Sequence, residues 1–471
     1  MMREYKRYDE YKDSGIDYLK TIPKNWSKMK IKYIAKNNFE SFIDGDWIES
    51  PYIQDEGIRL IQTGNIGNGR YIEKGDRYIS EETFIKLKCT EIFPNDILIC
   101  RLAEPVGRAC LAPQLNNRMI TSVDVCRLTP KDKYLKKFII YYMQMYKYLD
   151  YIESLARGST RQRISRSQLG EVYITIPPRQ EQQKIASFLD QKTAEIDEIL
   201  NKKEKLIDHL EKYKKSVITE AVTKGKLGDK YINEDGELVD NIEMKDSGVE
   251  WIGKFPSEWE LIKFKYLFSY QKGNSPNEYV DKVNGVPYLS MDYLRGNTDE
   301  ITYVRNDPNM IKVENNQILL LWDGSNSGEF IKSNKGILSS TMSVINDIKL
   351  NKDFSFYYFK ASEKYLKDQT IGMGIPHVDS KILKNIYLTV PSDKEQQKIA
   401  SFLDQKTAEI DDIISKKEKL IDLLEKYKKS LIFKAVTGKI DLRNYELEGG
   451  KEIVEHNNSR EAERKELSEV N

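Results

Sequence analysis

The sequence is poor in the residues that build metal and redox centres. Its 471 residues include only four cysteines and three histidines. Cys89, Cys100, Cys110 and Cys126 form no C-x-x-C pair, which predicts reduced core thiols in place of zinc ligands or a disulfide framework. No H-E-x-x-H pair is present, so the sequence offers no metalloprotease motif and we expect no metal site.

Long apolar runs and nucleotide-binding loops are missing too. No stretch approaches the roughly 18–20 consecutive apolar residues that a membrane span needs, and the first twenty residues are too polar for a secretion signal. We therefore expect a cytoplasmic protein without a membrane partner. The sequence has no G-x-x-x-x-G-K-[ST] phosphate loop and no S-adenosylmethionine loop followed by an N-P-P-Y or D-P-P-Y motif. These absences predict a chain without catalytic activity or a cofactor of its own.

An excess of charge of either sign is also lacking. The 75 Lys and Arg residues balance 74 Asp and Glu residues, which leaves a formal charge of +1 in a chain that is 32% charged. This balance argues against a uniformly basic nucleic-acid coat and against an acidic tail protein, but a local basic patch can exist within it. The length predicts roughly three domains.

An internal duplication is the most informative feature present. The string EQQKIASFLDQKTAEID runs from Glu181 to Asp197 and recurs unchanged from Glu395 to Asp411, and the similarity continues to Thr223 and Thr437. A shorter pair, KDSGIDYLKTIPKNW and KDSGVEWIGKFPSEW, precedes each copy at residues 12–26 and 245–259. Between these matched segments the two halves have diverged. We infer that the repeated part assembles and the diverged parts discriminate between unlike ligands.

Each repeated segment is expected to form one long helix. Pro177-Pro178 gives a start signal, and Gly225 and Gly438 give stop signals. Apolar residues alternate at spacings of four and three, which predicts a coiled-coil seam within the chain, with the two helices antiparallel. The seam residues are Ile185, Leu189, Ile196, Ile199, Leu206, Leu210 and Tyr213 in the first helix and Ile399, Leu403, Ile410, Ile413, Leu420, Leu424 and Tyr427 in the second. A plain dimerisation coil is the alternative.

The diverged regions mix short β-rich runs with turns. Residues 57–72 predict a strand, a tight turn and a strand, and residues 285–301 occupy the matching place. Polar side chains at these turns suit hydrogen bonding to base edges in the major groove. An ordinary hydrophilic hairpin tip is the alternative. The candidate DNA contacts are Arg59, Gln62, Thr63, Asn65 and Arg70 in the first region and Ser290, Asp292, Tyr293 and Arg295 in the second.

A basic segment near the end of the first diverged region is a second candidate surface. Residues 157–168 contain four arginines and no acidic residue, which suits contact with DNA phosphates, although a solvated basic loop is the alternative. Its candidate contacts are Arg157, Ser159, Arg161, Gln162, Arg163 and Arg166. The counterpart at residues 370–383 has lost the arginines and offers Met373, His377 and Lys381. The two regions would then read different sequences.

The arrangement as a whole resembles the specificity subunit of a type I restriction-modification system. The resemblance is carried by residues 251–259 (WIGKFPSEW), 60–66 (LIQTGNI), 158–160 (GST) and 176–185 (IPPRQEQQKI), and it covers almost the whole chain. It implies two target-recognition domains, each binding one half of a split, asymmetric double-stranded DNA target, with helices that set the spacing. It also implies two methyltransferase subunits that use S-adenosylmethionine, and restriction/translocase subunits driven by ATP and Mg²⁺.

The expected fold class is α+β, with two mixed α/β target-recognition domains, two long antiparallel coiled-coil helices and a pseudo-two-fold internal repeat. The predicted bounds are 1–176 for the first recognition domain, 177–224 for the first helix and 225–243 for a linker. Residues 244–390 are the second recognition domain, 391–438 the second helix and 439–471 a polar, disordered tail. A coiled-coil scaffold whose variable domains bind proteins or other ligands is the rival function, and an enzyme ranks third.

Overall fold

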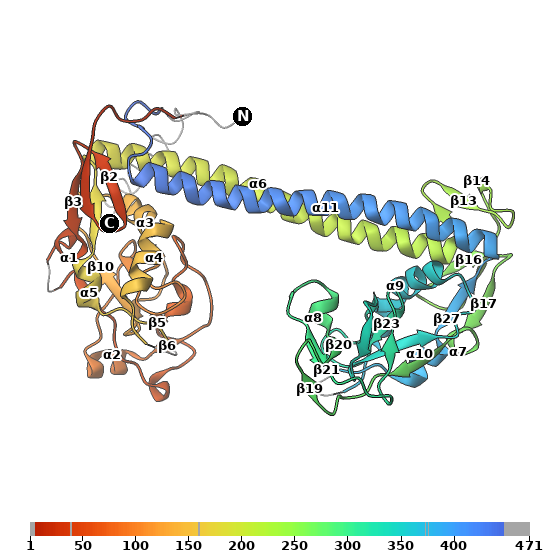
Figure 1. The fold of residues 1–471 in the computed structure, drawn as a ribbon. Coiled ribbons are helices and arrows are strands. Elements are labelled where there is room, and N and C mark those ends of the chain that lie inside the picture. The colour runs from red at the N-terminus through yellow and green to blue at the C-terminus, as the bar shows by residue number, and fades with distance from the viewer. Residues whose placement is uncertain (1–4, 38–39, 159–160, 373, 375, 447–471) are drawn as a thin grey trace, which may run out of the picture. The chain divides into compact units, whose positions relative to one another are not determined.

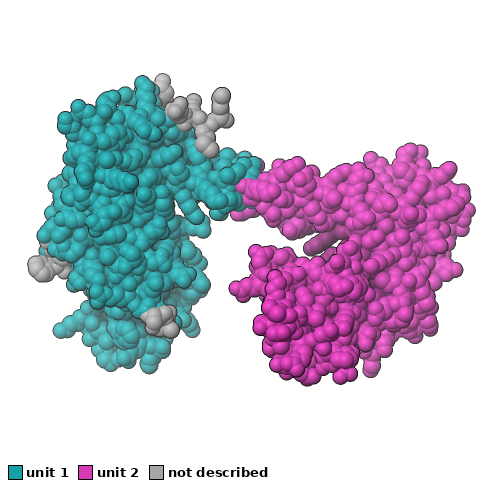
Figure 2. Space-filling model, viewed as in Figure 1, with its two compact units in different colours: residues 1–202, 420–471 teal, residues 203–419 magenta. Residues whose placement is uncertain are grey.

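The computed structural model describes residues 5–37, 40–158, 161–372, 374 and 376–446. The chain divides into two compact units, which are coloured separately in Figure 2. Unit 1 comprises residues 1–202 and 420–471, and unit 2 comprises residues 203–419. The chain passes from unit 1 into unit 2 along α6 (Arg179–Lys224) and returns along α11 (Asp393–Val436), as Figure 1 shows. Each unit therefore contains one part of both long helices.

The diverged region of unit 1 is built on two sheets with short helices around them. The four-stranded sheet has the order β4 (Phe42–Asp44), β10 (Val125–Leu128), β7 (Ile97–Cys100) and β8 (Ala109–Leu111). The three-stranded sheet has the order β6 (Tyr78–Ile79), β5 (Ile58–Ile61) and β9 (Met119–Thr121). The helices are α1 (Ile31–Ile34), α2 (Glu81–Leu87), α3 (Lys136–Met143), α4 (Tyr146–Leu155) and α5 (Arg166–Glu171), with 3-10 turns at Ser50–Tyr52 and Thr63–Asn65.

Two short strand pairs connect this region to the long helices. Their strands are β1 (Tyr11–Ile16), which pairs with β2 (Leu19–Pro23), and β3 (Ser27–Lys30), which pairs with β11 (Tyr173–Ile176). The pairing of β3 with β11 brings the beginning and the end of the diverged region together immediately before α6.

Unit 2 repeats this plan. Its four-stranded sheet has the order β18 (Ser269–Lys272), β26 (Met342–Asn346), β23 (Ile318–Leu321) and β24 (Phe330–Lys332). The five-stranded sheet has the order β19 (Tyr279–Val280), β21 (Thr302–Val304), β20 (Val286–Leu289), β25 (Gly336–Leu338) and β22 (Lys312–Val313). The remaining elements are β15 (Met244–Asp246), β16 (Lys254–Pro256), β17 (Glu260–Lys263), β27 (Tyr387–Val390), α7 (Phe264–Leu267), α8 (Met291–Leu294), α9 (Lys352–Asp368) and α10 (Ser380–Asn385).

The two diverged regions share one topology although their sequences differ. The order β4–β10–β7–β8 corresponds to β18–β26–β23–β24, and the parallel pair β5–β9 corresponds to the parallel pair β20–β25. The prediction of mixed helix and strand content is confirmed. β7 and β23 are buried at every position, and buried positions accept different apolar side chains, so one topology is compatible with two diverged sequences.

The predicted linker at residues 225–243 has a structure of its own. It contains a three-stranded sheet of β12 (Lys226–Leu227), β13 (Lys230–Ile232) and β14 (Leu238–Val239). Ile232 is buried in the same core as Trp259, which gives the segment an apolar anchor. The prediction of a tail from residue 439 also needs correction, because Ile440 and Leu442 are buried in the core of unit 1. Residues 447–471 of that tail lie outside the described residues.

The unchanged helix string holds both diverged regions by the same contacts. In unit 1 the buried carboxylate of Glu181 accepts a hydrogen bond from Trp26 Nε1 at 2.8 Å. In unit 2 the buried carboxylate of Glu395 accepts one from Trp259 Nε1 at 2.7 Å. A charged acceptor buried beside an indole donor gives a strong and directional contact. The two tryptophans and two glutamates therefore join the upstream repeat to the long helix in each half.

A second pair of contacts attaches α3 to α6 in unit 1 and α9 to α11 in unit 2. Tyr141 donates its hydroxyl to Asp190 at 2.8 Å in unit 1, and Tyr357 donates to Asp404 at 2.7 Å in unit 2. Burial, acting with the neighbouring aspartate, raises the pKa of both tyrosines, so both remain protonated donors. The acceptor carboxylates of these anchors all belong to the identical string, which gives a physical reason why that string is shared.

The predicted seam is partly wrong. Ile185, Leu189, Ile196, Ile399, Leu403 and Ile410 are buried, and Leu210, Leu424 and Tyr427 are half-buried. The side chains of Ile199, Leu206, Tyr213, Ile413 and Leu420 are instead 39–51% exposed. The positions turned inward are Thr193, Leu200, Ile207 and Lys214, and Thr407, Ile414, Ile421 and Lys428 repeat them. Adjacent apolar residues such as Ile199-Leu200 lie about 100° apart on a helix, so the pattern allowed either one to face inward.

Candidate nucleic-acid interface

Three segments of unit 1 that are far apart in the sequence come together at one surface. Residues 62–70, 101–108 and 157–166 form this group, which we call the loop surface of unit 1. The amide of Ala103 donates to the carbonyl of Gln162 at 3.0 Å, and the amide of Ile164 donates to the carbonyl of Arg101 at 3.0 Å. The polar turn and the basic segment that the sequence singled out separately are therefore neighbours.

Arg108 joins the first two of these segments, and sequence reasoning missed it. Its guanidinium is buried and donates to the carbonyls of Thr63, Ile66, Leu102 and Pro105 at 2.6–3.0 Å. A buried guanidinium with four carbonyl acceptors fixes the backbone of both segments at once. The sequence did contain a sign that Arg108 is buried. It lies between Gly107 and an apolar strand, a position at which a charged side chain must find partners inside the protein.

The basic segment is exposed, but it is less positive than its sequence indicates. Arg157, Arg161 and Arg163 are exposed and Arg166 is half-buried. Arg163 pairs with Asp124 at 2.7 Å, and Arg166 lies 3.6 Å from Asp44 and donates to the carbonyl of Phe42. Carboxylates from other segments thus neutralise part of the predicted excess of four charges. Gln162 is exposed beside them, and Ser159 lies outside the described residues.

The polar turn presents fewer side chains than expected. Residues 57–72 are not a simple hairpin, because β5 pairs with β6 and β9 and only an isolated bridge joins Ile66 to Tyr71. Asn65 is buried, accepts a hydrogen bond from the Gln62 amide and donates to the carbonyls of Ile72 and Lys74. Its amide shapes the turn from inside and does not reach the surface expected for a DNA contact.

Arg59 also lies inside the protein. Only 2% of its surface is exposed, and its guanidinium lies 3.1 Å from Glu73 and 3.5 Å from Asp76. The prediction that it faces DNA is corrected, because β5 is buried at all four positions and the Arg59 guanidinium is held there by Glu73 and Asp76. Gln62 and Thr63 are half-buried, and Arg70 is exposed, so these three retain surface positions.

Unit 2 builds the corresponding surface from residues 290–295, 322–329 and 371–381, which we call the loop surface of unit 2. The amide of Gly324 donates to the carbonyl of Pro376 at 2.9 Å, as Ala103 does to Gln162 in unit 1. Ile371 and His377 exchange two backbone hydrogen bonds, as Arg157 and Arg163 do. Gly158 and Gly372 begin these two loops with φ angles of 121° and 117°. The backbone of the loop is therefore kept while its side chains change.

The side chains of the second surface differ in charge from those of the first. Glu329 occupies the position of Arg108, because each follows a glycine with the same backbone contact. The amide of Gly107 donates to the carbonyl of Cys100, the last residue of β7, and the amide of Gly328 donates to that of Leu321, the last residue of β23, both at 2.8 Å. Glu329 pairs with Arg295, so a side-chain ion pair links the corresponding two segments in unit 2, where Arg108 uses backbone carbonyls in unit 1. Ser290 accepts from the Tyr293 amide and caps α8, which replaces the expected open turn.

The remaining candidates of unit 2 occupy mixed positions. Asp292 and Lys381 are exposed, whereas Tyr293 and His377 are half-buried. Met373 lies outside the described residues. Within the described part of the chain, no group of three His, Cys, Asp or Glu residues is placed to bind a metal ion. In the same part of the chain, no helix is both long and apolar enough to span a lipid bilayer.

Comparison with known proteins identifies the family. A profile described as the type I restriction modification DNA specificity domain matches residues 23–209 and 256–423. The chain belongs to this family. The predicted type I specificity subunit is therefore confirmed, and with it the prediction of a non-catalytic subunit, since the family is the DNA-specificity component.

Individual relatives agree with this assignment. The MjaVIII specificity subunit of Methanocaldococcus jannaschii is 41% identical over 189 residues, which cover 39% of this chain and 43% of that relative. The MjaIX specificity subunit of the same organism is 24% identical over 460 residues, which cover 93% of this chain and 98% of that relative. A solved structure described under complex assembly and conformational transition of the type I R-M system has a TM-score of 0.67 at 13% identity, covering 89% of this chain and 99% of that chain. The last likeness establishes the fold.

Proposed function

We propose that the chain reads a bipartite, asymmetric double-stranded DNA target, one half with the loop surface of each unit. The observation that carries the proposal is the pair of loop surfaces, which share their backbone hydrogen bonds and differ in their side chains. A shared backbone presents side chains to a duplex in the same way twice, and different side chains at those positions select different base edges. The relatives named as specificity subunits support the same function.

The surface residues that support DNA contact in unit 1 are the exposed ones. Arg70, Arg157 and Arg161 have no carboxylate within ion-pairing distance among the described residues, so their charges are available to phosphates. Gln62, Thr63 and Gln162 lie beside them and suit hydrogen bonding to bases. In unit 2 the loop surface offers the exposed Asp292 and Lys381 and the half-buried His377, whereas Arg295 is ion-paired with Glu329.

The long helices are proposed to act as an antiparallel spacer that fixes the distance between the half-sites. Within unit 1, Lys428 pairs with Asp197 at 2.6 Å, and within unit 2, Lys214 pairs with Asp411 at 2.5 Å. These two pairs are related by the internal repeat and place the helices in one antiparallel register. Each helix of more than forty residues is about 65 Å long, which exceeds the 34–36 Å turn of B-DNA.

Docking of two methyltransferase subunits is proposed for the exposed apolar positions of the same helices. Ile199, Leu206 and Tyr213 recur every seven residues along α6, and Ile413 and Leu420 repeat the stripe in α11. Apolar stripes of this kind on a long helix mark contacts with other proteins. In this proposal S-adenosylmethionine binds the methyltransferase subunits, ATP and Mg²⁺ bind the restriction/translocase subunits, and this chain binds neither.

The test is methylome sequencing of cells that carry the intact system, combined with mobility shifts of the assembled complex. We expect one split motif whose two halves change independently when residues of the two loop surfaces are exchanged. Exchange of residues 157–166 should alter one half-site only. Absence of sequence-selective binding by the assembled complex would refute the proposal and favour a scaffold that binds other ligands.

A further inference from the structure

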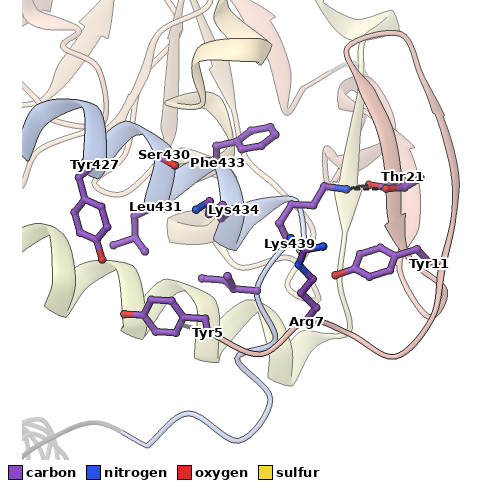
Figure 3. A pocket seen from close by; sticks show the side chains of 11 residues that line it. Tyr5, Arg7, Tyr11, Thr21, Tyr427, Ser430, Leu431, Phe433, Lys434 and Lys439 are labelled. Atoms are coloured by element: carbon purple, nitrogen blue, oxygen red, sulfur yellow. Dashed lines mark hydrogen bonds between the residues drawn. The ribbon is translucent and has the colours of Figure 1, made fainter. Parts of the chain in front are cut away.

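A pocket of about 760 Å³ lies in unit 1 at the C-terminal end of α11 (Figure 3). Residues 5–11, Thr21 of β2, the last turns of α11 and residues 439–440 form its walls. Arg7, Lys434 and Lys439 contribute three positive charges to the lining, and none of the described lining residues is acidic. Its volume is within the range of small-ligand and peptide side-chain sites.

Lys439 has no carboxylate partner among the residues that the structure describes. Its ammonium group donates to the carbonyl and hydroxyl oxygens of Thr21 at 2.9 and 2.7 Å and lies over the Tyr11 ring. Burial, and then the positive charges of Arg7 and Lys147, lower the pKa of Lys439. Among the described residues, no carboxylate lies within ion-pairing distance of Arg7, Lys434 or Lys439. An anion in the pocket would offset this uncompensated charge.

The internal repeat shows where the second helix has changed. Residues 202–223 and 416–437 differ at four positions, and three of these differences line the pocket. Leu431, Phe433 and Lys434 stand where the first copy has Val217, Thr219 and Glu220. The changes enlarge the apolar wall and replace an acid by a base, which is the combination expected for an anionic ligand with an apolar part.

Lys434 is not needed to end helix α11. Lysine near a helix C-terminus stabilises the helix dipole, and this is the ordinary explanation for Lys434. In the first copy, however, Glu220 occupies this position and pairs with Lys226 at 3.1 Å. Both helices end before a glycine with positive φ, Gly225 at 63° and Gly438 at 66°. The helix therefore stops equally well with the opposite charge.

We propose that this pocket binds an acidic peptide segment, and that the segment is residues 447–471 of the same chain. These 25 residues hold seven glutamates against four lysines and arginines. The string Glu452-Ile453-Val454-Glu455 places two carboxylates around two apolar side chains, which matches the charged and apolar walls. The proposal goes beyond DNA recognition and does not depend on it.

The described chain leads to the pocket. Tyr445 packs edge-on against Phe188 with ring centroids 4.9 Å apart, and Phe188 packs against Tyr5 at 5.3 Å. Tyr5 lines the pocket. The described chain therefore ends close to the pocket at residue 446, and the six residues from there to Glu452 can span up to about 20 Å, which is ample to reach the pocket.

Photo-crosslinking within the full chain tests the proposal. Benzoylphenylalanine replaces Ser430, which lines the pocket, or Ser216, which is its repeat-related control in unit 2. We expect the probe at position 430, and not at 216, to form crosslinks to peptides of residues 447–471, with a yield that is independent of protein concentration. Lys434→Glu, which restores the residue type of the first copy, should lower the yield about tenfold.

The controls make the result decisive. Lys202→Glu carries the same charge change at an exposed site of α6 and should leave the yield unchanged. Raising NaCl from about 50 to about 500 mM should lower the yield without any substitution, because salt screens the attraction. Crosslinks only to another chain or to a partner subunit, a yield no greater than at position 216, or a yield indifferent to Lys434→Glu and to salt would each overturn the proposal.

Discussion

At the residue scale, the structure separates side chains that shape the loop surfaces from side chains that face solvent. Asn65 and Arg108 hold the turn from inside, whereas Arg70 and Arg161 point outward at its edge. Residue type alone does not distinguish these roles, because Asn and Arg serve both as base readers and as internal hydrogen-bond donors. The sequence therefore singled out two segments that the structure brings together, but it could not identify which of their polar side chains are exposed.

Arg108→Ala is predicted to destabilise unit 1. The substitution removes the donors of four carbonyls that are otherwise shielded from water, so the free energy of unfolding should fall by about 2–4 kcal/mol. Thermal and urea unfolding measure the change. Arg70→Ala, on the exposed side of the same turn, should stay within about 0.5 kcal/mol. Equal effects of the two substitutions would contradict the role assigned to Arg108.

The two exposed arginines of the basic segment should control the salt dependence of DNA binding. Arg157→Ala combined with Arg161→Ala removes two cations that have no carboxylate partner in the described part of the chain, so the slope of log K against log salt should shrink by about 1.8. Binding titrations of the assembled complex at several NaCl concentrations measure the slope. Lys24→Ala, at an ion-paired surface site, serves as the control. An unchanged slope in the double variant would make the segment ordinary solvated surface.

The four cysteines should be unreactive in the folded protein. All four are free and buried, as the sequence predicted, and burial raises the pKa of Cys89 to about 11 and that of Cys110 to about 12. Iodoacetamide at pH 8 should label them slowly until denaturant is added. Because the folded state disfavours the thiolate, the stability they contribute is complete below about pH 8.5 and declines as the pH rises toward the folded-state values. Rapid native labelling of Cys110 would contradict this burial.

At the element scale, the repeat predicted the bounds of the long helices well, but it predicted less well which of their apolar residues are buried. The expected ranges 177–224 and 391–438 agree closely with Arg179–Lys224 and Asp393–Val436, because proline and glycine mark both ends. The seam differs because adjacent apolar residues at 199–200 and 206–207 satisfy the same spacing. Packing against the neighbouring helix and domain decides which of the two adjacent residues is buried. A single sequence does not show these tertiary contacts. The hairpin expected at residues 57–72 is absent for a similar reason. β5 pairs with β6 and β9, which lie beyond this segment in the sequence.

The buried glutamate anchors should contribute unequally to the two units. Glu181 accepts hydrogen bonds from Trp26, Tyr8 and Asn25, whereas Glu395 accepts from Trp259 and from the Ser392 amide. Glu181→Ala should therefore cost about 3 kcal/mol in unfolding free energy, and Glu395→Ala about 2 kcal/mol. Urea unfolding followed by tryptophan fluorescence reports both. A smaller loss for Glu181→Ala than for Glu395→Ala would show that the extra donors do not matter.

At the scale of the whole molecule, the spacer role predicts a change in target geometry without a change in either half-site. Insertion of seven residues after Lys205 and after Lys419 keeps the heptad phase and adds about 10 Å, or about three base pairs, to each helix. These sites avoid Thr193 and Thr407, which belong to the tyrosine anchors. Methylome sequencing should find the original half-sites with a longer gap. Altered half-site bases with an unchanged gap would show that the helices do not set the distance.

The paired anchors of the long helices have a consequence for how such proteins change. Glu181 and Asp190 on α6 and their counterparts Glu395 and Asp404 on α11 offer the same pair of acceptors, so a domain whose tryptophan and tyrosine fit one pair meets the same acceptors at the other. Exchange of a whole domain between these two positions, or with a related chain, leaves the fastening contacts intact. Domain exchange can thus give the protein a new pair of recognition domains without any change in the two long helices.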